Sequence, residues 1–132
     1  MKNKYAWLAG IIDGEGTITI TRQWRTKSYS YRPEIHITNT SSLMLNEAVS
    51  IMEIAVGKKP KIFSTNNGNK REVYRVRFQD RNSCFNLIKL LLPHLIAKKA
   101  QAELLLIFLK GDGSNSETQA ASIRKMNAGS SN

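Results

Sequence analysis

Apolar and polar residues follow two different periods along this chain, and the changes of period mark its elements. The segments 17–25 and 29–39 alternate apolar and polar residues, which is the pattern of a half-buried strand. Between 42 and 56 the apolar residues recur three and four apart, which indicates an amphipathic helix. Similar patterns predict strands at 60–66 and 73–79, and helices at 5–14, 81–92 and 98–110.

The alternation also assigns the strand residues to two faces. The apolar face is expected to point inward and comprises Ile18, Ile20, Ile35, Ile37, Tyr74, Val76 and Phe78. The opposite face is expected to be polar and comprises Thr17, Thr19, Thr21, Gln23, Arg25, Ser30, Arg32, Glu34, His36, Thr38, Arg75 and Arg77.

Turn and cap residues separate these segments. Ser41 or Ser42 is suited to begin the 42–56 helix, Gly57 to end it, and Asp80 to begin the next helix. The run 66–69, Asn-Asn-Gly-Asn, is a hairpin-turn signal. The predicted order is αββαββα, which is an α+β fold with a four-stranded antiparallel sheet backed by helices.

One domain is expected over residues 1–110, because 132 residues are enough for a single core. Residues 111–132 are rich in Ser, Gly and Asn, and either form a polar tail or include a short helix near 117–126. Ile123 and Met126 would anchor such a helix.

The distribution of charge along the chain indicates a class of function. The net charge is +10, and residues 17–40 and 57–81 together carry twelve Lys or Arg against three acids. A basic sheet face predicts a polyanionic partner, and a β-ribbon fits the major groove of DNA. The candidate base-contacting residues are Thr19, Thr21, Gln23, Arg25, Arg32, Glu34, His36, Thr38, Arg75 and Arg77.

Lysines and one arginine nearby are better suited to phosphates, which position a protein without reading sequence. They are Lys58, Lys59, Lys61, Lys70 and Arg71. Glu34 is unexpected beside phosphates, and would contact a cytosine or pair with an arginine. The alternative for any single residue of this set is a solvated polar face.

The segment 8–16, LAGIIDGEG, combines small residues with two acids. Ala6, Gly10 and Gly14 lie on one helical face, where a second backbone could approach closely. If two copies pair there, Ala6, Ala9, Gly10 and Asp13 would form the interface. Gly16 follows the helix, and a left-handed glycine at such a position would end it.

Asp13 and Glu15 would then lie at a helix C-terminus, where negative charge is disfavoured. In a pair of helices up to four carboxylates would converge and would require cations, Mg²⁺ above all. A glycine-punctuated helix–strand turn with solvated acids explains the same residues equally well.

This segment resembles the signature of the LAGLIDADG homing endonucleases, with Glu15 where the family most often has Asp. The single copy of the motif resembles the homodimeric branch. The resemblance implies a LAGLIDADG fold with a DNA-binding saddle, and metal binding by Glu15 and the Gly14 carbonyl. Asp13 would cap or bridge the helix pair.

A second segment, LPHLIAKKAQAELL at 92–105, resembles a late segment of the same family. By its spacing the active-site lysine falls on Lys98, with Lys99 as an alternative, and its role would be to polarise water or stabilise charge. Asn39 lies where the family commonly has a Gln or Asn that orients water.

The expected function is therefore a Mg²⁺-dependent, intron-encoded endonuclease that cuts a near-palindromic DNA site as a homodimer. The alternatives are an RNA-binding maturase and a non-cutting DNA-binding regulator on the same fold.

His36, His94 and Cys84 lack zinc-ligand spacing, and Cys84 is expected to be a buried apolar residue. No apolar run is long enough for a membrane span, so a soluble intracellular protein is expected.

Overall fold

The computed structural model describes residues 2–65 and 72–129, and contains a mixed α+β fold. Its elements follow the order α1 (Lys2–Glu15), β1 (Gly16–Trp24), β2 (Tyr29–Asn39), α2 (Ser42–Val56), β3 (Lys61–Thr65), β4 (Val73–Phe78), α3 (Arg81–Leu91), η1 (Leu92–His94), α4 (Lys99–Lys110) and α5 (Ser116–Gly129). The turn signal at 66–69 lies outside the described residues.

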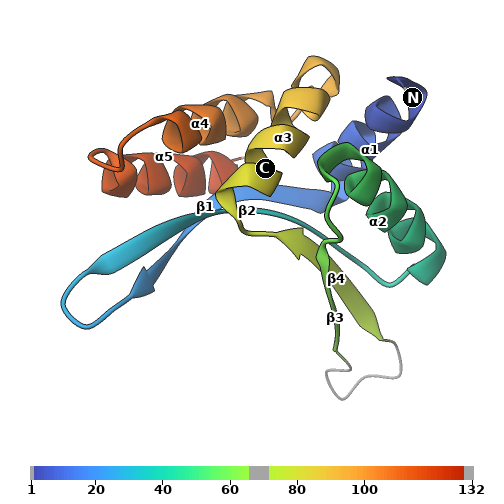
Figure 1. Cartoon of the computed structure of the whole chain (residues 1–132), viewed down its shortest axis with the longest axis horizontal. Helices are drawn as coiled ribbons and strands as arrows, with labels where there is room; N and C mark the ends of the chain where they lie inside the picture. Colours follow the sequence, from blue (N-terminus) through green and yellow to red (C-terminus); the bar gives the residue numbers. More distant parts are fainter. Residues whose placement is uncertain (1, 66–71, 130–132) are drawn as a thin grey trace.

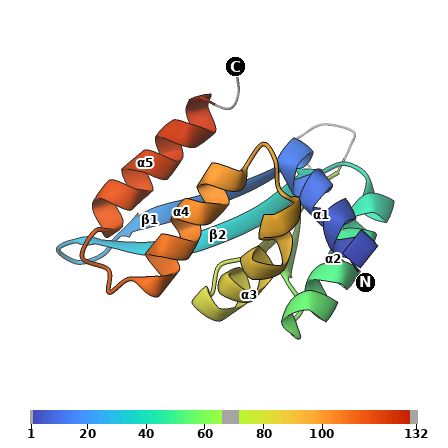
Figure 2. The same ribbon diagram turned by 90° about the horizontal axis from the view of Figure 1, so that it is seen from above.

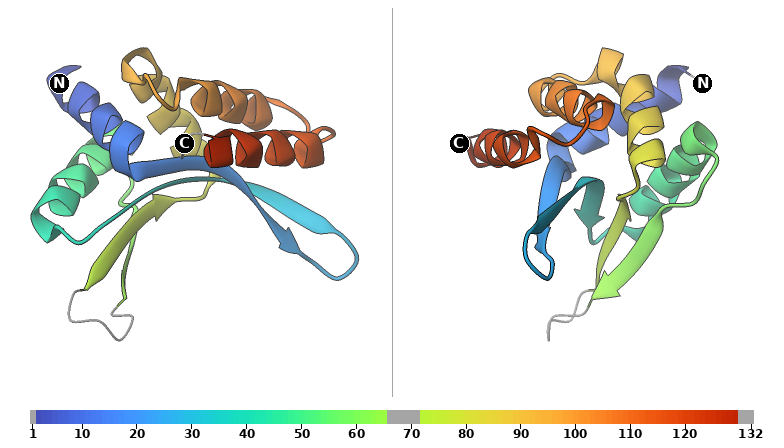
Figure 3. Two further views of the ribbon diagram at one scale, coloured as in Figure 1. Left: turned by 180° about the vertical axis from the view of Figure 1, so that it is seen from behind. Right: turned by 60° about the vertical axis from the view of Figure 1, so that its left-hand side comes forward.

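The four strands form one antiparallel sheet in the order β1-β2-β4-β3. Two hairpins, β1–β2 and β3–β4, are joined at the centre of the sheet by the pairing of β2 with β4. The α-helices cover one face, while both hairpins curve away on the other side (Figures 1 and 3). The predicted fold class, a helix-backed four-stranded saddle, is thus confirmed.

The core lies between the helices and the inward face of the sheet. Every predicted inward isoleucine is buried, as are Val76 and Phe78, and Tyr74 is half-buried. The helices contribute Leu8, Ile12, Met52, Leu87, Leu91 and Leu105, all with no exposed surface. Cys84 is buried among them, and this burial raises the pKa of its thiol far above the ordinary value.

Helix α1 passes directly into β1, and Gly16 does not end the helix in the way the sequence suggested. Among the described residues only Gly57 and Gly113 have positive φ, so Gly16 is not left-handed. A Cβ at Gly16 would instead lie 2.8 Å from Ile12 Cα and 3.1 Å from the His36 carbonyl oxygen. Gly16 therefore lets the first strand pass close to the helix backbone.

The predicted caps of the two following helices are present. The Ser41 hydroxyl accepts a hydrogen bond from Met44 N–H at the start of α2, and Gly57, with φ of 81°, ends it. The Asp80 carboxylate accepts from Ser83 N–H at the start of α3. These contacts satisfy main-chain groups that a helix end leaves unpaired.

The last segment forms a helix rather than a tail. In α5 Ala120 and Ile123 are buried, and the helix lies beside α4 over β1 (Figure 2). The Asn127 side-chain amide donates to the Ile18 carbonyl at 3.2 Å and accepts from the buried Gln101 at 3.3 Å. None of the helices in the described ranges is long and apolar enough to cross a membrane.

Candidate nucleic-acid interface and catalytic site

The C-terminal end of α1 brings Glu15 against Asn39, the last residue of β2. The Asn39 side-chain amide donates to Glu15 Oε2, and its carbonyl oxygen accepts from Ser41 N–H at 2.8 Å. The capped start of α2 therefore holds Asn39, which in turn orients an exposed carboxylate. Two of the predicted catalytic residues are direct neighbours, although 24 positions separate them in the sequence.

Asp13 is engaged by its own chain. Its carboxylate accepts from the main-chain N–H groups of Ile96 at 2.8 Å and Lys98 at 3.0 Å. Lys98 Nζ donates to the main-chain carbonyl of Asp13 at 2.7 Å. Its ammonium group thereby lies beside the C-terminal end of α1, where the helix dipole is negative and a positive charge is stabilising. Of the two acids at this helix end, Asp13 is therefore half-buried and bonded to its own chain, and Glu15 is exposed.

The two candidate lysines differ in burial and in hydrogen bonding. Lys98 is half-buried and directly bonded to the end of α1. Lys99 is exposed and begins α4, with no side-chain hydrogen bond in the described part of the chain.

The small residues of α1 form an exposed stripe. Ala6, Gly10 and Gly14 are all exposed, and a Cβ added at either glycine would meet no atom within 4 Å. Ala9 has no exposed surface, so it belongs to the core of the chain and cannot contact a partner.

On the opposite side of the sheet, strand register gathers the predicted base-contacting residues on one face. His36 lies between Thr17 on β1 and Arg77 on β4, and Arg77 is paired with Lys61 on β3. The remaining pairs add Thr19 beside Glu34, Thr21 beside Arg32, and Thr38 beside Arg75. Gln23 and Arg25 are exposed toward the tip of the β1–β2 hairpin.

Glu34 is the one carboxylate in the centre of this face, and it is almost completely buried. It contacts His36 Nδ1 and accepts from Gln79 Nε2 at 2.5 Å, while Arg77 Nη1 lies 3.9 Å away. Glu34 is thus a partner of an arginine, as one of the two interpretations predicted. Gln79 was not among the predicted site residues, although its position continues the alternation of Arg75 and Arg77.

A second missed residue is Phe63, on the polar face of β3. The guanidinium of Arg77 lies 4.5 Å from its ring centroid and the ammonium of Lys61 lies 5.2 Å away. Beside this group, Arg75 Nε donates to the Thr38 hydroxyl at 3.2 Å. Strand β3 is short, and its alternation was too brief to show that an aromatic ring would face outward.

Basic residues surround an open groove of about 790 Å³ between β2, the start of β3 and the start of α3. Its charged lining comprises Arg25, Arg32, Lys58, Lys59, Lys61, Arg77, Arg81 and one acid, Asp80. Lys58 is paired with Asp80 at 3.3 Å, and this pair together with the Ser83 cap outweighs the effect of burial and lowers the pKa of Asp80. Lys70 and Arg71 lie outside the described residues.

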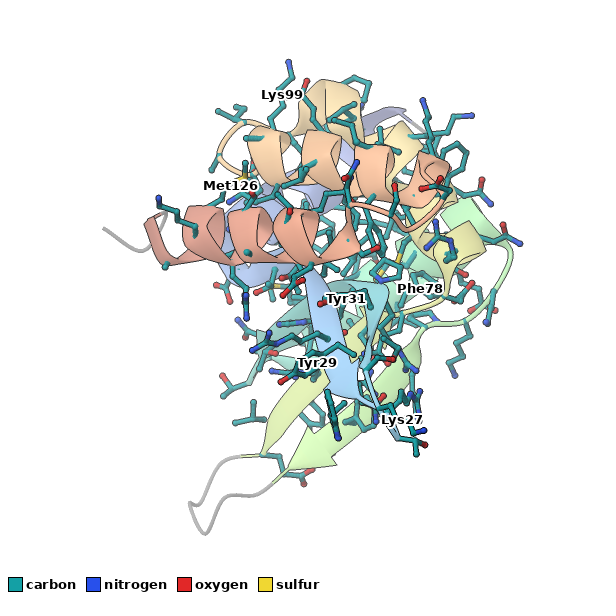
Figure 4. All side chains as sticks on the ribbon, turned by 90° about the vertical axis from the view of Figure 1, so that its left-hand side faces the viewer. Lys27, Tyr29, Tyr31, Phe78, Lys99 and Met126 are labelled. Atoms are coloured by element: carbon teal, nitrogen blue, oxygen red, sulfur yellow. The ribbon has the colours of Figure 1, made fainter. Side chains whose placement is uncertain are left out.

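The arm formed by β1 and β2 carries exposed aromatic residues. Tyr29 lies toward the tip near Lys27, away from the helices that bear Lys99 and Met126 (Figure 4), whereas Tyr31 is half-buried and packs against the core. Trp24 packs edge-on against Tyr29 with ring centroids 5.0 Å apart, and the Arg22 guanidinium lies 4.4 Å from the Tyr29 centroid.

Solved structures of similar fold are homing endonucleases. I-CvuI in complex with its target has a TM-score of 0.78 and 21% identity, over 95% of this chain and 82% of that chain. The archaeal intron-encoded I-Vdi141I, complexed with DNA, has a TM-score of 0.71 and 18% identity, over 94% and 84%. The group I intron-encoded I-CeuI, also complexed with DNA, has a TM-score of 0.68 and 13% identity, over 89% and 59%.

No curated protein sequence matches the chain. The family model described as the LAGLIDADG-like domain matches residues 2–89, a range that includes α1, all four strands and the exposed Glu15. With most of its length matched, the chain belongs to the LAGLIDADG-like domain family.

Proposed function

We propose that the protein is a site-specific double-strand DNA endonuclease that acts as a homodimer and requires a divalent cation, Mg²⁺ in the cell. The observation that carries the proposal is the meeting of three separate segments at the end of α1. Glu15 contacts Asn39, and Asp13 is bonded to Lys98 and Ile96. The basic, concave face of the sheet continues directly from this point.

For recognition, the two hairpins would lie along the major groove, with phosphate contacts from the rim of the basic groove. Arginine is suited to guanine, and Thr, Gln and His to other base edges. The proposed base contacts are Thr19, Thr21, Gln23, Arg25, Arg32, His36, Thr38, Arg75 and Arg77. Lys58, Lys59 and Lys61 would set the position of the protein through the backbone.

For cleavage, the available ligands fit a hard cation. Glu15 is exposed and offers a carboxylate, Gly14 is an exposed residue with a main-chain carbonyl, and oxygen is the ligand that Mg²⁺ prefers. Mg²⁺ held there would activate water and stabilise the leaving oxygen of the phosphodiester. Asn39 would orient Glu15, and Lys98 would stabilise negative charge at the scissile phosphate.

A second copy of the chain would complete this site. In the described residues no group of three or more His, Cys, Asp or Glu side chains could hold a metal ion. Pairing of two copies along Ala6, Gly10 and Gly14 would bring the two Glu15 carboxylates together. Ile96, whose N–H binds Asp13, exposes 86% of its surface, which adds apolar area at this end of the helix. A two-fold dimer reads a near-palindromic site.

The test is a two-step experiment that starts from duplexes of random sequence. These duplexes are selected for binding in Ca²⁺, and the selected ones are then incubated with Mg²⁺. Cleavage of both strands at one position within a near-palindrome is the expected result. Selection of a duplex that is never cut would instead support a DNA-binding regulator, and preference for structured RNA over every duplex would support a maturase. An origin within an intron predicts that the selected site matches a junction of intron-free host DNA.

A further inference from the structure

A buried carboxylate at the centre of a DNA-facing surface requires an explanation. Glu34 is only 5% exposed, although it lies on the polar face of β2. A negative charge there weakens attraction to phosphates, so phosphate binding does not account for it. The surroundings of Glu34 account for the buried carboxylate, because each of its two oxygens faces a side chain that we assign to DNA recognition.

The partners of Glu34 come from two strands and the turn that follows β4. Oε2 contacts His36 Nδ1, and Oε1 accepts from Gln79 Nε2 at 2.5 Å. Arg77 Nη1 lies 3.9 Å from Oε1, and Arg32 Nη1 donates to Gln79 Oε1 at 3.4 Å. Burial alone raises the pKa of Glu34, but hydrogen bonds from His36 and Gln79 and the charges of His36 and Arg77 outweigh it, so the pKa is lowered.

An ionised carboxylate can only accept hydrogen bonds, so its neighbour His36 must carry a proton on Nδ1. The other ring nitrogen, Nε2, has no partner among the described residues. When the ring is protonated both nitrogens are donors, and when it is neutral Nε2 is an acceptor. The neutral form is suited to the amino groups of adenine or cytosine in the major groove.

Arg77 is held from two sides. Glu34 attracts its guanidinium, and the Phe63 ring lies against it at 4.5 Å from the centroid. A guanidinium that is already ordered loses less conformational entropy when it binds a base. Gln79 is similarly held, between Glu34 and Arg32.

We propose that Glu34 is a positioning residue for base recognition: it selects the tautomer of His36 and orients Arg77 and Gln79, so that the three side chains meet DNA as one unit. This inference rests on the proposed function. It predicts that base preference at neighbouring positions of the half-site depends on a residue that touches no base.

The test is E34Q, which removes the charge but keeps the shape. The amide oxygen still accepts from Gln79, and the amide NH₂ then faces His36 Nδ1, which becomes an acceptor. His36 Nε2 becomes a donor, and guanine or thymine should replace adenine or cytosine at one position per half-site. We expect a change of about tenfold in relative affinity there, the lower end of the value of one good base contact.

E72Q is the matched control, because Glu72 is exposed and its loss changes the net charge equally. Both variants should bind duplexes of random sequence more tightly at low salt, and only E34Q should change base preference. An E34Q profile identical to that of E72Q would overturn the inference. Similar thermal unfolding of E34Q and the wild type would exclude a general loss of structure.

Imidazole ¹⁵N chemical shifts of the DNA-free protein test the same point independently. We expect the proton on Nδ1 in the wild type and on Nε2 in E34Q, and an unchanged tautomer would overturn the inference. If the wild type shows no duplex preference at all, the proposed function fails, whereas the ¹⁵N shifts still decide whether Glu34 controls His36.

Discussion

Lys98 Nζ donates a hydrogen bond to the main-chain carbonyl of Asp13 at 2.7 Å. The same lysine offers its main-chain N–H to the Asp13 carboxylate at 3.0 Å. Lys98 therefore both neutralises the end of α1 and ties it to the start of α4. A residue in this position stabilises the fold as well as supplying charge to the site, and its substitution is a poor test of catalysis alone. Glu15, an exposed side chain held by Asn39, is the cleaner test.

Glu15→Gln should abolish cleavage and leave DNA binding intact. The amide keeps the shape of the side chain but loses the charge that attracts a hard cation. In metal-free buffer the variant should bind as tightly as the wild type or more tightly, because one negative charge near phosphate is gone. Binding and cleavage of the selected duplex are measured in parallel. Glu103→Gln, an exposed change on α4, is the control. Wild-type cutting by Glu15→Gln would exclude Glu15 from the mechanism.

Gly10→Leu should convert the dimer into a monomer. A Cβ at Gly10 meets no atom within 4 Å, so the side chain fits the single chain and obstructs only a partner helix. The isolated protomer should even gain helical stability, of the order of 1 kcal/mol, on loss of a helix-interior glycine. Sedimentation velocity measures the mass, and a dimer of unchanged affinity would place the interface elsewhere.

Gly16→Ala should destabilise the fold by about 1–3 kcal/mol. The new Cβ would lie 2.8 Å from Ile12 Cα, a main-chain atom that cannot turn aside. Gly129→Ala, in α5, is the control, because a Cβ there meets nothing within 4 Å and the residue lies outside the proposed dimer interface. Urea unfolding measures both variants, and equal midpoints would show that the strand can move away from α1 at little cost.

Arg75→Ala and Lys59→Ala should weaken DNA binding in different ways. Loss of an arginine that contacts guanine costs roughly 1–3 kcal/mol and relaxes preference at one position per half-site. Loss of a phosphate-contacting lysine weakens all sequences alike and reduces the salt slope by about one. Lys59 is preferred to Lys58, which is paired with Asp80. A uniform loss in Arg75→Ala at several salt concentrations would identify Arg75 as a phosphate contact.

Acid should remove the stability that Glu34 contributes. Its pKa is lower in the folded protein than the ordinary value of 4.5, so the unfolded chain takes up the proton first. The contribution is complete above pH 4.5 and is lost as the pH falls through the lower, folded-state pKa. The difference in unfolding free energy between the wild type and E34Q should therefore shrink as the pH is lowered through this range. A constant difference would mean that the charge of Glu34 is not stabilising.

Sequence patterns predicted local features well, because short-range rules determine them. Strand β2 begins and ends at the predicted residues, and Ser41, Gly57 and Asp80 cap the predicted helices. Contacts between distant segments were not predictable in this way. Asp13 bonds to residues more than 80 positions away, and Asn127 bonds to Ile18 across 109 positions. Such contacts depend on tertiary packing, which periodicity does not encode.

The absence of a loop between α1 and β1 has a consequence for the geometry of the proposed cleavage. Glu15 ends the helix and Gly16 begins the strand, so Thr17, the first proposed DNA-facing residue, follows the proposed catalytic carboxylate by two positions. Residues two apart on a strand are separated by about 6.8 Å, close to two base-pair steps of about 3.4 Å. Each further outward residue of β1 thus advances by about two base pairs along the groove. In the proposed endonuclease the distance from the scissile bond to each recognised base would then be set by covalent geometry, and one inserted residue after Glu15 would exchange the two faces of the strand.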